Sequence, residues 1–151
     1  MKIRMFSDND LAGCVQLLIS VFNEEPWNDN WTVEKAELYL MDFVNNPGFM
    51  GYIAENSTGV IGFLFGYRKR WWSADEFHVN EFCVKISEQR RGIGKELMKI
   101  LEDDLVKQKI MNIVLLTNKG VPAMEFYERN GFTAVERIVF LAKSLEDQID
   151  R

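Results

Sequence analysis

The chain has 151 residues, of which 47% are hydrophobic and 13% aromatic, the composition of a globular domain rather than of a disordered segment. Its formal net charge of −5 gives no general attraction to phosphate backbones, so we expect no nucleic-acid partner. No apolar run reaches membrane-spanning length and the N-terminus lacks the apolar stretch of a signal peptide, so we expect a cytoplasmic protein with no membrane partner. Cys14 and Cys83 are far apart and accompany a single histidine, a pattern that indicates neither a metal site nor a disulfide framework.

The first third of the chain predicts a strand followed by two helices. Polar and apolar residues alternate over 2–6, and Ser7 and Asp8 can cap a helix whose apolar residues recur at helical spacing up to Phe22. The segment 23–31, which contains a proline and two tryptophans, breaks that helix. Thr32 can cap a second amphipathic helix, which ends at residues 46–48, Asn-Pro-Gly.

The remaining chain alternates strands and helices. The stretches 49–55 and 60–70 flank the turn 56–59 and predict a hairpin, and 76–84 is a third extended segment. An amphipathic helix opens at Gly92, an apolar strand covers 112–117, and Pro122 and Gly131 bound a helix over 121–130. Residues 132–142 read as closing strands. This order predicts one mixed α/β domain spanning 1–151.

The sequence around Gly92 has the chemistry of a phosphate site. A helix that starts there presents unpaired N–H groups and the positive end of its dipole, and Gly92 and Gly94 let an anion approach the backbone. Three basic residues flank them in an otherwise acidic chain: Arg90, Arg91 and Lys95. A P-loop would need Ser or Thr after Lys95, and a Rossmann fingerprint would need a third glycine at 97. A glycine-rich turn without a ligand remains the structural alternative.

Two motifs resemble the GNAT N-acetyltransferase superfamily. The pattern Gln89-x-x-Gly92-x-Gly94, between a strand and an amphipathic helix, is similar to the family's acetyl-CoA loop. The second, from Ala123 through Phe126-Tyr127 to Gly131-Phe132, is similar to its C-terminal motif. The resemblance implies a single-domain α/β fold with a mixed, mostly antiparallel central sheet flanked by helices, whose central strands splay apart.

The same resemblance implies the cofactor-binding residues. Acetyl-CoA would be the cosubstrate, with its pyrophosphate on the loop that starts at Gln89, held by the backbone amides of Arg90, Arg91, Gly92, Ile93, Gly94 and Lys95. Main-chain groups of Phe82, Cys83 and Val84 would pair with pantetheine, and Asn118 would contact its arm. The chain departs from the family where Gln89 replaces a commoner arginine and Ile86 a frequent proline.

Acetyl transfer to an amine needs a base and an acid. Tyr127 matches the family's usual general acid for the CoA sulfur, although an aromatic core role is the alternative. For the base, simple alternation puts His78, Asn80, Phe82 and Val84 on one strand face and Glu81 and Cys83 on the other. We expect His78 as base, with Glu81 as runner-up if a bulge turns it inward. A structural His78 and a water base both remain open.

The segment between the first two predicted helices is where the family builds its acceptor wall. Acidic and aromatic residues together suit a cationic amine through charge and cation–π contact, and the acceptor-binding candidates are Glu24, Glu25, Trp27, Trp31 and, on the strand, Asn80. Pro26-Trp27 shows some likeness to aminoglycoside N-acetyltransferases. The alternative is that Trp27 and Trp31 pin the loop to the core.

The sequence therefore predicts acetyl transfer from acetyl-CoA to a primary amine, by direct attack, on a small-molecule and cationic acceptor. Two alternatives remain: a protein or peptide N-acetyltransferase, and a non-catalytic acyl-CoA-binding regulatory module. The identity of the acceptor and the oligomeric state, a homodimer included, are left open.

Overall fold

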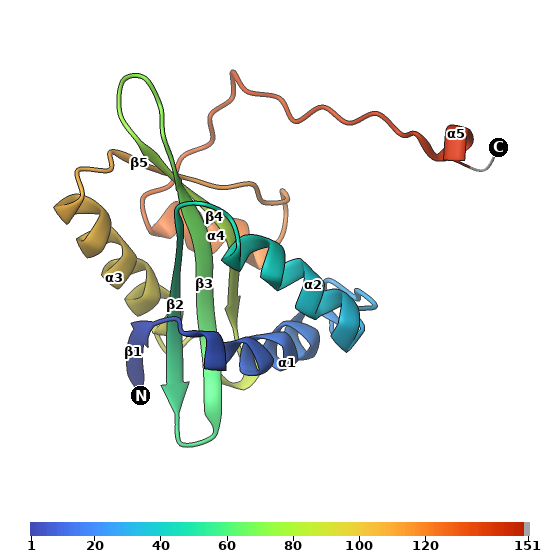
Figure 1. Ribbon diagram of the computed structural model, residues 1–151, viewed down its shortest axis with the longest axis vertical. Helices are drawn as coiled ribbons and strands as arrows, with labels where there is room; N and C mark the ends of the chain where they lie inside the picture. Colours follow the sequence, from blue (N-terminus) through green and yellow to red (C-terminus); the bar gives the residue numbers. More distant parts are fainter. Residues whose placement is uncertain (150–151) are drawn as a thin grey trace. The chain divides into compact units, whose positions relative to one another are not determined.

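The computed structural model describes residues 1–149 and divides into two compact units, Met1–Thr117 and Asn118–Arg151. The first unit holds a five-stranded sheet in the order β1-β2-β3-β4-β5, drawn in Figure 1. Its strands are β1 Lys2–Met5, β2 Phe49–Asn56, β3 Gly59–Lys69, β4 Glu76–Val84 and β5 Asn112–Val114. The first four pair antiparallel and β5 pairs parallel to β4. This confirms the predicted mixed, mostly antiparallel sheet.

Helices cover both faces of this sheet (Figure 1). On one face lie α1 Leu11–Phe22, preceded by the 3₁₀ turn η1 Asp8–Asp10, and α2 Val33–Val44, whose N-cap Thr32 accepts a hydrogen bond from Lys35 N. Their buried apolar residues form one core with Phe63 and Phe65 of β3. On the other face lies α3 Ile93–Lys107, so close that a Cβ added to Gly62 of β3 would lie 3.2 Å from Leu97 Cδ1. The apolar helix stripes read from the sequence therefore bury the two faces of the sheet.

Strand β4 carries a bulge that changes which side chains share a face. Phe65 pairs with Glu81 but the next residue of β3, Gly66, pairs with Val79, so Asn80 is an extra residue in β4. Because β3 stays regular here, the residues paired with alternate β3 positions lie on one face. His78, opposite Tyr67, therefore shares the α1/α2 face with Glu81 and Cys83. The simple alternation expected from the sequence was wrong on this point.

The two parallel strands at the sheet edge separate early. β5 pairs with β4 only over Glu76–His78, whereas β4 continues to Val84. The strand predicted over 112–117 is correspondingly shorter in the structure, which ends β5 at Val114. The β4–β5 pairing therefore ends early at the sheet edge, whereas the family resemblance implied a splay between central strands.

The second unit contains α4 Pro122–Arg129 and the short α5 Glu146–Ile149. Pro122 occupies the first turn of α4 and Gly131 follows it with φ 90°, as the sequence predicted for that helix. The closing strands predicted over 132–142 were wrong, because the described part of this unit contains no strand. A strand needs a hydrogen-bonded neighbour, which an apolar local pattern does not supply. Across residues 1–149, no helix combines the length and apolar character needed to span a membrane.

Candidate active site

The loop after β4 connects the sheet to the N-terminus of α3. The 3₁₀ turn η2 Ile86–Glu88 opens it, and Gln89 Nε2 donates a 3.0 Å hydrogen bond to Val84 O, which ties the loop to the end of β4. Arg90 and Gly92 have positive φ values of 66° and 83°. Gly92 is the N-cap of α3, and the buried Ile93 beside it anchors the helix on the sheet. The glycine at 92 supplies the left-handed backbone that turns the chain into the helix.

The backbone of this loop is open to solvent next to a helix N-terminus. Residues 89–92 are exposed, and a Cβ added to Gly92 would meet no atom within 4 Å, so solvent reaches the backbone. The first N–H groups of a helix have no intrahelical acceptor, and the helix dipole adds positive potential there. Arg91 is bridged to Glu88 at 3.1 Å. The anion site at Arg90, Arg91, Gly92, Ile93, Gly94 and Lys95 stays a prediction.

Glu81 is a half-buried carboxylate under the α1/α2 face of β4. Tyr39 of α2 donates its hydroxyl to Glu81 Oε2 at 2.6 Å, and Phe82 N donates to Oε1 at 3.2 Å. Burial raises the pKa of Glu81 from 4.5 to about 7, with a smaller contribution from the negative charge of Asp29, while the two hydrogen bonds act in the opposite direction. A carboxylate of this pKa suits general-base work near neutral pH.

His78 lies on the same face, two pairings along the strand from Glu81. Its ring contacts the Tyr67 ring at 5.2 Å between centroids, and its Nε2 lies 3.5 Å from Glu76 Oε1. Among the described residues, that buried nitrogen has no hydrogen-bond partner. The bulge thus brings both predicted bases to one face, where the sequence had separated them.

The segment 23–32 is folded by short-range hydrogen bonds at the end of α1. Asn23 clamps Trp31 through both side-chain amide atoms, at 2.8 Å to its N–H and 3.1 Å to its carbonyl. The indole of Trp31 donates to Asp29 Oδ2 at 3.0 Å and its ring contacts the Tyr39 ring at 4.8 Å. A chain of contacts therefore runs from this loop through Tyr39 to Glu81.

Trp27 and the two glutamates occupy the outer part of the same loop. The Trp27 ring packs on Phe22 at 5.4 Å and stays half-exposed, while Glu24 and Glu25 are exposed. Trp31 packs against the core as a partly buried residue. The two tryptophans therefore differ: Trp31 is held by hydrogen bonds and a ring contact, whereas Trp27 makes a ring contact with Phe22 and is half-exposed. Asn80, the bulged residue of β4, is half-buried.

Cys83 is sealed inside the core, with 2% of its surface exposed. Its thiol points to Leu17 O of α1 at 4.0 Å, and burial raises its pKa well above the ordinary value. A buried, protonated thiol is a poor nucleophile. The side chain of Cys83 therefore contributes packing, and only its main chain suits cofactor contact.

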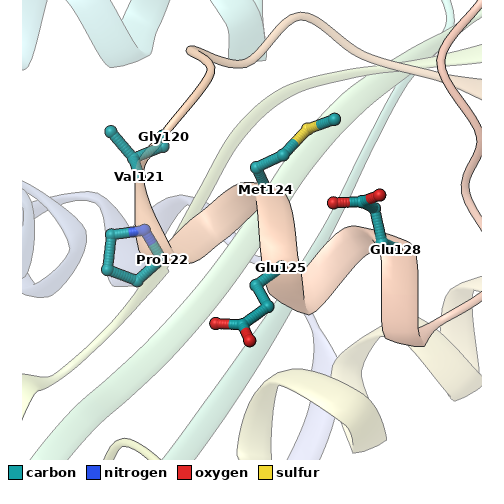
Figure 2. A pocket seen from close by; sticks show the side chains of 6 residues that line it. All are labelled: Gly120, Val121, Pro122, Met124, Glu125 and Glu128. Atoms are coloured by element: carbon teal, nitrogen blue, oxygen red, sulfur yellow. The ribbon is translucent and has the colours of Figure 1, made fainter.

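Tyr127 lies in the second unit, on α4. Its half-buried ring makes edge-on contacts with Phe126 at 5.6 Å and Phe132 at 5.4 Å, and its carbonyl accepts from Phe132 N at 3.0 Å. The same unit has a hollow of about 400 Å³, and Figure 2 shows its lining residues: Gly120, Val121, Pro122, Met124, Glu125 and Glu128. Asn118 begins this unit as an exposed residue.

Sequence reasoning missed Tyr39, and it placed Asp29 in the acidic loop without foreseeing its effect on Glu81. Tyr39 stands next to the buried Leu40 on α2, and its contact with Glu81 spans 42 positions. The available signal was a tyrosine beside an apolar helix stripe, because a buried phenol requires a polar partner. Periodicity does not reveal which partner that is.

Comparisons with known proteins agree with the fold of this chain. The family model described as "Acetyltransferase (GNAT) family" matches residues 12–132, whereas a comparison with curated protein sequences gave no significant match.

Among solved structures, an integron cassette protein from V. cholerae superposes with a TM-score of 0.81 at 16% identity, covering 99% of this chain and 95% of the other. The aminoglycoside acetyltransferase meta-AAC0020 from an uncultured soil metagenomic sample, in complex with sisomicin, gives 0.72 at 22% identity, covering 95% of each. AAC(6')-Iy, in complex with the bisubstrate analog CoA-S-monomethyl-acetylneamine, gives 0.74 at 17% identity, covering 95% of this chain and 97% of the other. The matched family model spans most of the chain, which therefore belongs to the GNAT family and is an acetyltransferase.

Proposed function

We propose that this acetyltransferase transfers the acetyl group of acetyl-CoA to a primary amine of a cationic small molecule, with Glu81 as general base. The proposal depends on the Glu81 carboxyl, because burial raises its pKa to about 7. Glu81 is linked through Tyr39 to the acidic and aromatic 23–32 loop. Structural relatives that include aminoglycoside acetyltransferases support the same acceptor class.

The base has a defined task. An alkylammonium of pKa about 10.4 is neutral in about one molecule in a thousand near pH 7.4, which costs about 4 kcal/mol. Glu81, ionised above its pKa of about 7, accepts the ammonium proton directly or through a water. His78 on the same face is the second candidate for this step, and its Nε2 has no hydrogen-bond partner among the described residues.

The remaining steps balance the reaction. Bound acetyl-CoA supplies an activated acetyl group, its pyrophosphate held at the Gly92 loop and its pantetheine along Phe82, Cys83 and Val84. The neutral amine nitrogen forms the new bond to the acetyl carbon, and the bond from that carbon to sulfur breaks. As the family resemblance implies, the Tyr127 hydroxyl gives its proton to the departing thiolate. The second proton that the nitrogen loses as the amide forms restores that hydroxyl, so the net proton released is the one that Glu81 holds. The buried thiol of Cys83 supports direct attack rather than an acyl-enzyme.

The acceptor would bind along the outer loop. The half-exposed ring of Trp27 would contact the cation, and Glu24, Glu25 and Asp29 supply negative charge. Trp31 lines the inner side, where it is fixed against Tyr39. The 23–32 loop thus joins a cation-binding surface to the base that removes the ammonium proton.

The test is release of free CoA from acetyl-CoA across a panel of amines. We expect turnover with polyamines or aminoglycosides, and little with peptides that carry a free N-terminus. Turnover confined to peptides would replace the acceptor class. Tight acetyl-CoA binding with no turnover on any amine would show a regulatory module instead of an enzyme.

A further inference from the structure

A close polar contact joins Tyr39 of α2 to Glu81 of β4. The hydroxyl lies 2.6 Å from Oε2, and the backbone N–H of Phe82 lies 3.2 Å from Oε1, so both carboxylate oxygens are held. Burial raises the pKa of Tyr39 far above its ordinary value, which keeps the phenol protonated and donating at any working pH. A donor fixed on one oxygen stabilises the ionised carboxylate and sets its orientation.

Tyr39 is itself held from two sides. Its ring contacts Trp31 at 4.8 Å and Phe43 at 4.7 Å. Trp31 is in turn clamped by Asn23 and bonded to Asp29. The hydroxyl position is therefore determined by the 23–32 loop as well as by α2.

We propose that Tyr39 is a positioning residue for the reaction, whose hydroxyl orients the Glu81 carboxylate and favours its ionised form, and that Trp31 fixes Tyr39 in that place. The inference rests on the proposed role of Glu81 as base. Tyr39 acts through Glu81 and contacts no reacting atom in this assignment.

Besides Tyr39, the backbone N–H of Phe82 also favours the ionised form of Glu81. The charge of Asp29 and burial both favour the protonated form. From the same strand, Cys83 lies alongside as a neutral thiol, with Cys14 of α1 behind it. Farther along this face stand His78, Glu76 and Tyr67. Tyr39 is therefore the side chain in this set that offsets the burial of the carboxylate.

The experiment compares Tyr39→Phe with a matched control on the opposite face of the sheet. Tyr52 is also buried and donates its hydroxyl to a carboxylate, Asp104 Oδ2, at 2.7 Å, so Tyr52→Phe removes an equivalent bond away from the site. The Glu81 titration is followed by carboxyl-carbon NMR on protein labelled at glutamate, with the signal assigned by its loss in Glu81→Gln. We expect Tyr39→Phe to move the Glu81 midpoint up by about one pH unit, and Tyr52→Phe to leave it unchanged.

The acidic limb of the kcat/KM profile should move by the same amount in Tyr39→Phe. Relative to wild type, this variant should lose less activity at high pH than at low pH, because Glu81 is ionised in both proteins at high pH. Tyr39→Met, which fills similar space without a hydroxyl, should repeat the shift if Tyr39→Phe folds poorly. An unchanged NMR midpoint in both folded variants would overturn the proposal. If the midpoint moves while Glu81→Gln keeps full activity, Tyr39 still controls the carboxylate but the base assignment fails.

Discussion

Replacing Glu81 by glutamine separates its catalytic role from its effect on stability. The substitution keeps the shape of the side chain and an oxygen that accepts from Tyr39, but it removes the titrating proton. Loss of a general base lowers the rate by about a hundredfold to ten-thousandfold. We therefore expect kcat/KM for the amine to fall at least about a hundredfold, with acetyl-CoA affinity unchanged.

The same substitution should raise the stability of the protein at high pH, although it lowers the activity. Because burial raises the pKa of Glu81 from 4.5 to about 7, the folded protein holds the proton more tightly than the unfolded chain. The wild-type protein therefore has this contribution in full below about pH 4.5, and loses it as pH rises to about 7. After a discount for the half-exposed side chain, the loss is about 2 kcal/mol in the free energy of unfolding. Residue 81 does not titrate in the glutamine variant, so the variant keeps this part of the free energy of unfolding at high pH.

Urea unfolding at about pH 5 and about pH 8 measures this difference. Relative to wild type, Glu81→Gln should gain about 2 kcal/mol of stability between the two conditions while it loses activity. Asp104→Asn is the matched control, because it also accepts a tyrosine hydroxyl but lies on the α3 face. If the stability of wild type and of Glu81→Gln changes equally with pH, the reasoning about burial is refuted. This holds independently of the kinetic result.

The remaining predictions address the cofactor loop, the acid and the acceptor. Gly92→Asp puts a carboxylate at a backbone phosphate site and should weaken acetyl-CoA binding at least about tenfold by calorimetry, whereas Gly59→Asp, another exposed positive-φ glycine, should not. An unaltered affinity in folded Gly92→Asp would contradict the loop assignment. Tyr127→Phe should lower kcat by about two orders of magnitude with KM for acetyl-CoA nearly unchanged, and a loss below about threefold would place the acid elsewhere. Trp27→Ala should raise the acceptor KM by about tenfold, with the exposed Trp72→Ala as control. A sharp drop in thermal stability with normal acceptor kinetics would identify Trp27 as a structural brace.

The architecture of the first unit could be read from the sequence, because its helices and strands follow local rules. Thr32 caps α2 through its own hydroxyl, and the turn at 56–59 joins β2 and β3. The αL glycine at 92 opens α3 as the spacing of the loop indicated. Each of these signals lies within a few residues of the feature it predicts.

The details of the site could not be read in the same way. A single extra residue at Asn80 moves His78 to the face of Glu81, and alternation along β4 has no information about that insertion. The bond between Tyr39 and Glu81 joins residues that only the tertiary fold brings together. The segment 132–142 shows the reverse error, since its apolar residues predicted strands that the structure does not form.

The burial of both cysteines has a practical consequence for measuring this enzyme. Cys14 and Cys83 are 0% and 2% exposed, and burial raises the pKa of each thiol. Because thiol reagents attack the thiolate, the folded chain should react with them slowly. A colorimetric thiol reagent would then report newly released CoA against a low protein background. For the same reason, a cysteine introduced at an exposed position, such as Glu24, would accept a fluorophore selectively in the native protein.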